Sequence, residues 1–510
     1  FNSGAMEHAT NIAYPVSTIS GGSLAAETLF AHELAHHWWG NTITCRTQED
    51  MWLNEGWASY SESLFLEAVY GKERYNENIE LNHRDVLQFA HIRDGESLPV
   101  SGIGHANTYG NHVYNKGADM VHTLRGMMGD DAFFKACKTF QSDFKFQDVS
   151  TQDMLETFQK ETTTDLSGFF NQWIKKSGFP HFDIHWVQGQ GGDYQVNIKQ
   201  TPRFNEEVYS NVPITITAFS QDFTRFDAEV VVNKNQETFN ITVPFEPEFW
   251  AFDYDDKISD ATTTAVFITD EEGTLSLQQD GLIEVVVDSL SEGDSLLMRV
   301  EHHWAPADGT YGVPEGVVLS PQRFWNIDGI WREEANLGAT INYSGIETTS
   351  SAAFGYLDNQ LIRITEDSLV LLYRPNGISA WTVYSDYVVE MGSAFDKRGS
   401  INITNLSKGQ YAFGMYDSQL ASGKIHTKPH ANFKIFPNPV DKELKVQFEE
   451  KHDCCVVEIT NVYGQVVKRQ KIKGKKIEHV VDVSDLTPGN YFVGIITENL
   501  GYNAMRFVVK

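Results

Sequence analysis

The chain has 510 residues, a formal net charge of −29 and a high aromatic content, with 11 Trp, 20 Tyr and 32 Phe. This length is typical of several domains, and the aromatic content excludes a disordered chain. The negative charge argues against nucleic acid and anionic membranes as partners, and no apolar run reaches the roughly 18 residues that a transmembrane segment needs.

The first part of the sequence has a helical pattern. Residues 1–7 lack the basic start and apolar stretch of a signal peptide and resemble the middle of a folded domain, so we expect the chain to begin downstream of its natural start. Ser150 followed by Asp153 resembles a helix N-cap with an acidic third position. Composition and stop signals predict helices over 23–39, 53–70, 113–128, 130–144, 150–161 and around 169–174.

The pattern changes after Pro180. Short alternating runs separated by turn residues, such as 194–198 and 213–217, are typical of β-sandwich modules. We expect one β-sandwich over 181–266 and a β-rich domain of unknown role over 267–426. A polar linker over 422–430 precedes a last short β-domain over 430–510.

Four acidic residues lie close together near the end of the expected sandwich: Asp253, Asp255, Asp256 and Asp260. Carboxylates in such a cluster could bind calcium. The favoured interpretation is a solvated acidic turn.

Two histidines four residues apart lie within the first predicted helix. In the run His-Glu-Leu-Ala-His over 32–36, His32 and His36 share one helical face. Two imidazoles at this spacing can bind one zinc ion, and Glu33 between them can take a proton from a water at the metal. The alternative is a surface helix with two solvated histidines, because this pattern alone is only moderately specific.

A catalytic zinc needs a third protein ligand and one open position. Glu55 follows in the run Leu-Asn-Glu-Gly-Trp-Ala over 53–58, near the start of the second predicted helix. A helix–loop–helix can fold this carboxylate back onto the first helix. The sequence therefore offers His32, His36 and Glu55 as metal ligands.

These runs resemble the M1 family of zinc aminopeptidases. The similarity comprises His-Glu-Leu-Ala-His-His-Trp-Trp-Gly-Asn over 32–41 and Trp-Leu-Asn-Glu-Gly-Trp-Ala over 52–58. It implies a multidomain α+β chain with a mainly helical, thermolysin-like zinc peptidase domain over 1–180, truncated at its N terminus. It also implies one Zn²⁺ per chain, with Glu33 as the general base.

A motif near the N terminus agrees with this family. Gly4-Ala5-Met6-Glu7 resembles the family's Gly-Ala-Met-Glu-Asn strand, whose Glu binds the free α-amine of the substrate. His8 replaces the usual Asn. A carboxylate suits an ammonium group, since charge-assisted hydrogen bonds are strong. The resemblance therefore implies that Gly4, Ala5, Met6 and Glu7 bind substrate.

A second motif, Val-Tyr-Asn-Lys-Gly-Ala over 113–118, resembles the family's Tyr-x-Lys-Gly-Ala segment. The family's Tyr donates a hydrogen bond to the oxyanion of the tetrahedral intermediate, and Tyr114 is the matching position. A neutral phenol directed at developing negative charge is a reasonable stabiliser. Tyr109 is close enough in sequence to compete for this assignment.

The end of the chain resembles the C-terminal sorting domain of type IX secretion substrates. The similarity covers Phe-Lys-Ile-Phe-Pro-Asn-Pro-Val over 433–440, the segment over 482–491 and the final run over 506–510. It implies that the type IX secretion machinery is a partner and that the protein is secreted or held at the cell surface. A generic sandwich module is the alternative.

Together these features predict a secreted zinc aminopeptidase that removes N-terminal residues from peptides with a free N terminus. The alternative is a non-catalytic cell-surface binding or adhesion protein that retains a peptidase-like domain. A relic of that kind should have lost ligands or the base, and here none is lost. One relative of the family also hydrolyses an epoxide, but no residue here argues for that reaction.

Overall fold

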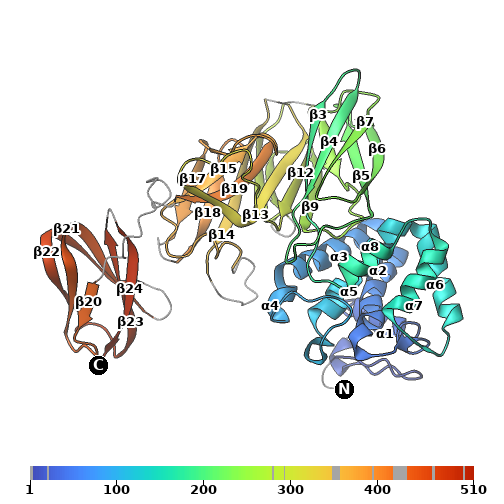
Figure 1. The fold of residues 1–510 in the computed structure, drawn as a ribbon, viewed down its shortest axis with the longest axis horizontal. Helices are drawn as coiled ribbons and strands as arrows, with labels where there is room; N and C mark the ends of the chain where they lie inside the picture. The colour runs from blue at the N-terminus through green and yellow to red at the C-terminus, as the bar shows by residue number, and fades with distance from the viewer. Residues whose placement is uncertain are drawn as a thin grey trace.

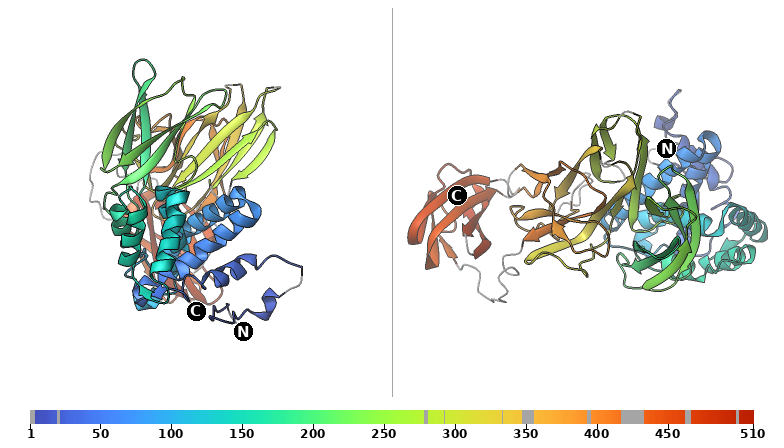
Figure 2. Two further views of the ribbon diagram at one scale, coloured as in Figure 1. Left: turned by 90° about the vertical axis from the view of Figure 1, so that its right-hand side faces the viewer. Right: turned by 90° about the horizontal axis from the view of Figure 1, so that it is seen from above.

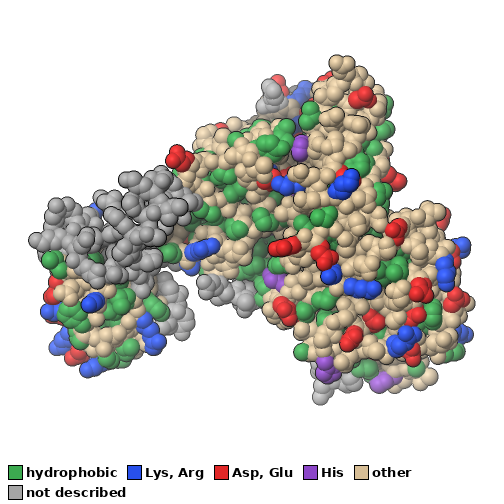
Figure 3. Space-filling view, viewed as in Figure 1, with side chains coloured by type: hydrophobic (Ala, Val, Ile, Leu, Met, Phe, Trp, Pro, Cys, Tyr) green, Lys and Arg blue, Asp and Glu red, His purple; other side chains and the backbone are tan. Residues whose placement is uncertain are grey.

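The computed structural model describes residues 4–19, 22–277, 281–291, 293–332, 334–346, 356–392, 396–416, 433–461, 466–497 and 500–510. Helices occupy the first third of the chain and strands follow, so the expected combination of helices and sheets is confirmed (Figure 1). The predicted linker over 422–430 lies outside the described residues. Acidic and basic side chains are interspersed on the face drawn in Figure 3.

The helical part contains most of the predicted helices. Ser150 caps its helix through a capping box with Asp153, as the sequence predicts. A short parallel pair of strands, β1 (Thr44–Cys45) and β2 (Asp148–Val149), joins the segment after the first helix to the segment between the sixth and seventh helices. The helices are α1 (Glu27–Ala35), α2 (Glu55–Tyr70), α3 (Lys72–Asp85), α4 (His91–Arg93), α5 (Asn111–Met128), α6 (Asp130–Asp143), α7 (Thr151–Phe158) and α8 (Ser167–Phe169), with π-helical turns at Val86–Ala90 and Phe170–Ile174.

Helix α1 is shorter than the prediction of 23–39. It ends at Ala35, and His36 is its C-cap with helical dihedral angles, so the backbone N–H of His36 still donates to the His32 carbonyl at 3.2 Å. The chain then turns, and Gly40 has a φ of 144°. His32 and His36 therefore lie on the same face, one helical turn apart, although α1 ends at Ala35.

Helix α3 was not predicted from the sequence. Most of its side chains are polar, and its buried residues are only Tyr75, Ile79 and His83, four residues apart on a narrow stripe. The helix continues through the π-helical turn over Val86–Ala90 into α4. A stripe this narrow gives a weak periodic signal.

Helices α2 and α5 meet through two glycines. A Cβ atom at Gly56 would lie 2.9 Å from the Gly117 Cα, and one at Gly117 would lie 2.8 Å from the Gly56 Cα. Side chains are therefore excluded at the crossing, and the two backbones approach directly. The crossing lies beside Glu55 on α2 and one turn after Tyr114 on α5.

Two three-stranded antiparallel sheets follow the helices and share one hydrophobic core with them. Figures 1 and 2 show these sheets against one end of the helical part. The first sheet has the order β3 (Phe182–Gln188), β4 (Asp193–Gln200) and β7 (Gln236–Thr242), and the second has the order β6 (Arg225–Val232), β5 (Val212–Phe219) and β8 (Phe249–Phe252).

Two larger antiparallel sheets share a separate core that contains Trp325 and Tyr411. Strand β9 crosses the predicted boundary after residue 266 and pairs with β12. The six-stranded sheet has the order β16 (Thr382–Val383), β15 (Leu369–Arg374), β19 (Gly409–Tyr416), β13 (Val317–Ile330), β12 (Leu296–His303) and β9 (Thr262–Thr269). The five-stranded sheet has the order β10 (Gly273–Leu277), β11 (Ile283–Ser289), β14 (Asn336–Ser344), β18 (Arg398–Ile403) and β17 (Tyr387–Met391).

The last sheet has its own hydrophobic core, which contains Phe433, Val493 and Phe507. Its strands pair antiparallel in the order β20, β21, β23 and β24, and β22 pairs with β21. They span β20 (Phe433–Phe436), β21 (Glu443–Asn461), β22 (Val466–Asp482), β23 (Gly489–Thr497) and β24 (Leu500–Val509).

The acidic segment between β8 and β9 is only partly solvated, so the favoured interpretation is wrong for Asp253 and Asp260. Asp253 and Asp260 are each 6% exposed. The Asp253 carboxylate accepts a hydrogen bond from the Ile258 backbone at 2.8 Å. The segment also packs on α5, where the Nε2 atom of His122 lies 2.7 Å from the Asp256 carbonyl oxygen. This packing between the helical part and the sheets removes Asp253 and Asp260 from water, whereas Asp255 stays exposed.

The glycine crossing predicts the effect of one added methyl group. Gly117→Ala should destabilise the protein by about 1–3 kcal/mol through overpacking, even though alanine favours a helix interior by about 1 kcal/mol. Gly104→Ala is the matched control, because nothing lies within 4 Å of a Cβ at Gly104. Chemical denaturation checks both variants. A Gly117→Ala variant as stable as the wild type would show that the close approach is not required.

Candidate metal centre

All nine residues predicted for the site line one cleft of about 920 Å³. Helices α1, α2 and α5 and the N-terminal segment all contribute residues to its lining. The cleft is therefore built from segments that are far apart in sequence. The nine residues are Gly4, Ala5, Met6, Glu7, His32, Glu33, His36, Glu55 and Tyr114.

His32, His36 and Glu55 converge at the floor of the cleft. The two Nε2 atoms of the histidines lie 3.2 Å apart. One Glu55 oxygen lies 3.5 Å from the Nε2 atom of His32 and 3.2 Å from that of His36. All three residues are buried. Within the described ranges they are the one group of three His, Cys, Asp or Glu residues that could hold a metal ion.

These three ligand atoms fit zinc. A tetrahedral ion with bonds of about 2.0–2.1 Å separates its ligand atoms by about 3.3 Å, and imidazole nitrogen and carboxylate oxygen are ordinary zinc ligands. The spacings of 3.2–3.5 Å match this separation. A cation among these three buried atoms would be a common partner for both imidazole nitrogens and the carboxylate oxygen.

The charges of this group are strongly coupled. Burial acts to lower the pKa of His32, but hydrogen bonds with Glu55 and Glu62 raise it to about 9. Burial acts to raise the pKa of Glu55, but hydrogen bonds with His32 and His36 lower it to about 2. The same carboxylate that holds protons on the imidazoles would also attract a cation to them.

Two further groups orient the histidines, and the sequence analysis missed both. The Nδ1 atom of His32 lies 2.9 Å from a Glu62 oxygen, and the Nδ1 atom of His36 lies 2.9 Å from the Trp39 carbonyl oxygen. The Trp39 ring is stacked on Trp57 of α2, with ring centroids 3.9 Å apart. Glu62 lies two helical turns after Glu55 on the same face of α2, so its spacing was a usable signal.

Glu33 lies beside the three ligands. Its side chain is 5% exposed, and its Oε2 atom is buried with no hydrogen-bond partner. Burial raises the pKa of Glu33, while His32 and His36 act in the opposite direction. A buried carboxylate oxygen without a partner costs free energy. Such an oxygen is suited to accept a proton from a molecule that enters the cleft.

Tyr114 faces the same group from α5. Its ring is stacked parallel to the His32 ring, with centroids 6.1 Å apart and an interplanar angle of 6°. Burial and the negative charge of Glu55 raise the pKa of Tyr114. The phenol is therefore a neutral hydrogen-bond donor near pH 7. Tyr109 also lines the cleft but is 70% exposed.

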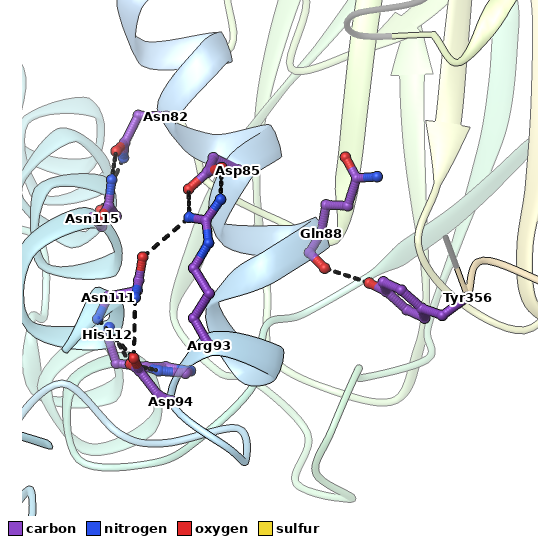
Figure 4. Close-up of polar contacts among 9 residues, drawn as sticks. All are labelled: Asn82, Asp85, Gln88, Arg93, Asp94, Asn111, His112, Asn115 and Tyr356. Atoms are coloured by element: carbon purple, nitrogen blue, oxygen red, sulfur yellow. Dashed lines mark hydrogen bonds and ion pairs between the residues drawn. The ribbon is translucent and has the colours of Figure 1, made fainter. Parts of the chain in front are cut away.

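The position of Tyr114 depends on the N terminus of α5, which Asp94 caps from another segment (Figure 4). The Asp94 carboxylate accepts hydrogen bonds from the backbone N–H groups of Asn111 and His112, at 3.0 and 2.9 Å. The His112 side chain adds a contact of 2.7 Å. A Cβ at Gly110 would lie 2.8 Å from this carboxylate, so the glycine permits the close approach.

In the described part of the N-terminal segment, strand pairing is limited to one bridge. Met6 forms a single antiparallel bridge with Ala13, with two backbone hydrogen bonds of 2.9 Å. The side chain of Asn41 donates to the Glu7 carbonyl oxygen at 2.8 Å. These contacts support an extended segment but not a longer ladder. Glu7 is half-buried and lines the cleft.

Helix α3, which the sequence analysis missed, supplies a wall of the cleft. Asn82 donates to the Asn115 carbonyl oxygen at 2.9 Å and thereby joins α3 to the turn that carries Tyr114. Asp85 is paired with Arg93 at 2.9 Å (Figure 4). The wall residues from α3 are Asn78, Ile79, Leu81, Asn82 and Asp85.

Two known protein families match this chain, one at each end of the sequence. Residues 1–173 match the peptidase family M1 domain, and residues 434–510 match the secretion system C-terminal sorting domain. The chain therefore carries an M1 peptidase domain and a C-terminal sorting domain. The sorting domain indicates export by type IX secretion. In the described part of the chain, no helix has the length and apolar character of a membrane span.

Individual relatives are distant and longer. The chain is 24% identical over 233 residues to probable aminopeptidase 1 of Sulfurisphaera tokodaii, covering 42% of this chain and 29% of the relative. It is 27% identical over 239 residues to glutamyl aminopeptidase of Rattus norvegicus, covering 42% and 25%. The chain therefore spans less than a third of the length of these relatives.

A solved structure of aminopeptidase A of Legionella pneumophila, in complex with aspartic acid, is also similar. The TM-score is 0.38 at 19% sequence identity, covering 46% of this chain and 26% of that chain.

The contact between Glu62 and His32 predicts a role in metal affinity. Glu62→Gln removes the charge that orients the imidazole and should weaken Zn²⁺ binding by about 10- to 100-fold. Competition with a chromophoric chelator measures the affinity. Glu73→Gln on the exposed side of α3 is the control and should bind Zn²⁺ like the wild type. Equal affinity in Glu62→Gln and Glu73→Gln would contradict the proposed orienting role.

Proposed function

We propose that this chain is a secreted zinc-dependent aminopeptidase that hydrolyses the first peptide bond of peptides with a free N terminus. One Zn²⁺ per chain would be held by His32, His36 and Glu55. When bound there, zinc supplies a Lewis acid that polarises the peptide carbonyl and makes a water nucleophilic near neutral pH. The M1 domain and the distant aminopeptidases support a peptidase.

The observation that carries this proposal is the unpartnered Oε2 atom of Glu33 beside the three convergent ligands. In the proposed reaction, this carboxylate takes a proton from the attacking water. It then passes the proton to the amine that leaves. Burial raises the pKa of Glu33, and a base with a raised pKa holds the transferred proton more readily.

Tyr114 is proposed to donate its phenol proton in a hydrogen bond to the oxygen on which negative charge develops. Its ring is stacked parallel to that of His32, and after burial it is the charge and hydrogen bonding of Glu55 that raise its pKa, which supports a hydroxyl group close to the proposed ligands. The contacts of Asp94 at the start of α5 fix this position before substrate enters. A donor that is already in place stabilises the transition state without further reorganisation.

The N-terminal segment over 4–7 is proposed to recognise the end of the peptide. Glu7 lines the same cleft and raises the pKa of Glu33 through its negative charge, which supports a position close to the reaction centre. Its carboxylate would accept charge-assisted hydrogen bonds from the α-ammonium group. Gly4, Ala5 and Met6 would contribute backbone and apolar contacts to the first residue.

The finer architecture is part of the same proposal. The helical part over 1–180 is a thermolysin-like peptidase domain, and the sheets over 181–266 form a β-sandwich. The β-rich domain over 267–426 has no assigned role, and the sorting domain occupies 430–510. The separate cores of the two larger sheets and of the last sheet support the boundaries of the β-rich domain, whereas the first two sheets share a core with the helical part.

The alternative function is a non-catalytic cell-surface binding or adhesion protein. The buried ligands and the unpartnered base argue against it, because a site without chemistry gains nothing from isolating these groups from water. Activity assays separate the two functions directly.

The proposed base should be separable from the metal ligands. Glu33→Gln should retain one Zn²⁺ per chain and lose about 10²-fold or more in kcat, since it removes proton transfer and not a ligand. Elemental analysis and fluorogenic aminoacyl substrates measure the two quantities. A loss of zinc in proportion to activity would mean that Glu33 is structural.

Selectivity for the free amine should depend on Glu7. The wild type should cleave an aminoacyl substrate far faster than its N-acetylated form, because acetylation removes the positive charge. Glu7→Gln keeps the shape of the side chain and should narrow this gap by slowing only the free substrate. Equal rates for the two substrates with the wild type would identify an endopeptidase instead.

The sorting domain should be dispensable for chemistry. Its core is separate from that of the helical part, so deletion of residues 430–510 should leave kcat/KM unchanged. In the native host, the deleted form should remain inside the cell. Fractionation and peptidase assays check both outcomes, and normal export of the deleted form would refute the role of the domain as a sorting signal.

A further inference from the structure

A second cavity lies where the helical part meets both pairs of sheets. Its volume is about 380 Å³, within the range of small-molecule sites. His91 of α4 lines it together with Arg203 and Phe204 after β4 and with Trp304 after β12. Tyr356 contributes from the segment before β15. Among the described residues that line it, none is acidic.

Two arginines line this cavity, and Arg203 is the one without a carboxylate partner among the described residues, because Arg323 pairs with Asp358 at 2.7 Å. Its guanidinium group lies over the Phe204 ring at 4.5 Å and over the Trp304 ring at 5.2 Å. Its Nη1 atom is buried and has no hydrogen-bond partner. Burial lowers the pKa of Arg203 to about 10, and a hydrogen bond with Tyr356 acts in the opposite direction. Within the described ranges, no carboxylate forms an ion pair with this cation.

His91 offers a second unsatisfied group. Its Nδ1 atom is buried without a hydrogen-bond partner, and its ring packs against Phe204 and Tyr356 with centroid distances of 4.8 and 5.7 Å. Burial and the charge of Arg203 lower the pKa of His91 to about 3. The ring is therefore neutral near pH 7 and does not compensate the charge of Arg203.

We propose that this cavity binds an organic carboxylate. Its carboxylate group would pair with the Arg203 guanidinium, whose planar fork of donors matches two oxygens. Its apolar body would pack against Phe204 and Trp304, because hydrocarbon buried on aromatic rings is removed from water. An anion here supplies the partner that the buried Nη1 atom of Arg203 otherwise lacks. The aromatic rings favour an organic anion over an inorganic one.

The cavity adjoins the wall of the metal cleft. The Tyr356 hydroxyl group donates a hydrogen bond to the Gln88 carbonyl oxygen (Figure 4). Gln88 lies in the π-helical turn that continues α3, three residues after Asp85, which lines the cleft. The cavity is therefore linked to this turn through Tyr356 and through His91, the residue that follows the turn. The binding proposal does not depend on the proposed peptidase activity.

Benzoate is the probe for this site. It should bind the wild type in isothermal titration calorimetry and raise its Tm, whereas benzyl alcohol, which has the ring but no charge, should not. Arg203→Gln should weaken benzoate binding by about tenfold or more, since it removes a charged hydrogen-bond donor. Arg332→Gln is the matched control, because Arg332 is exposed and pairs with Asp294 away from the cavity.

A crystal of the wild type soaked in 4-bromobenzoate gives an independent test if Arg203→Gln does not fold. The anomalous bromine signal should lie among Phe204, Trp304 and Tyr356. No binding of benzoate, equal binding of benzyl alcohol, or a bromine signal only outside the cavity would overturn the proposal. Tighter binding of inorganic phosphate than of benzoate would overturn the assignment to an organic carboxylate.

Discussion

The direct contact of two backbones at Gly56 and Gly117 is the constraint on which the metal centre depends. Glu55 precedes one glycine, and Tyr114 lies one turn before the other. Any side chain at the crossing would separate α2 from α5 and move both functional groups. The absence of two Cβ atoms therefore sets the distance between a proposed metal ligand and a proposed transition-state donor.

Buried polar groups at this centre are positioned by other polar groups. Glu62 and the Trp39 carbonyl oxygen orient the two imidazoles, and Asp94 fixes the start of α5. The stacked rings of Trp39 and Trp57 hold the carbonyl oxygen in place. The unpartnered oxygen of Glu33 contrasts with these satisfied groups. Each of these orienting groups is held by a partner, whereas the Glu33 carboxylate keeps an oxygen available for chemistry.

The sequence predicted those features that follow from local periodicity. His32 and His36 share a face because a helical spacing of four requires it, and Ser150 with Asp153 forms the expected capping box. Glu62 could have been found by its helical spacing from Glu55.

Features that depend on tertiary packing were missed. Helix α3 buries only a narrow stripe, so its sequence resembles a solvated segment. Asp253 and Asp260 were predicted to face water, but packing of their segment against α5 and the sheets buries them. The cavity around Arg203 joins residues from segments far apart in the chain, and no local pattern indicates it.

The central claim is that three residues on two helices hold a zinc ion. Anomalous diffraction at the zinc absorption edge, recorded from crystals of the zinc-loaded protein, tests it most directly. The account predicts one strong peak about 2.1 Å from the Nε2 atoms of His32 and His36 and from a carboxylate oxygen of Glu55. No peak there in crystals that contain zinc, or a peak bound only by other residues, would contradict the account.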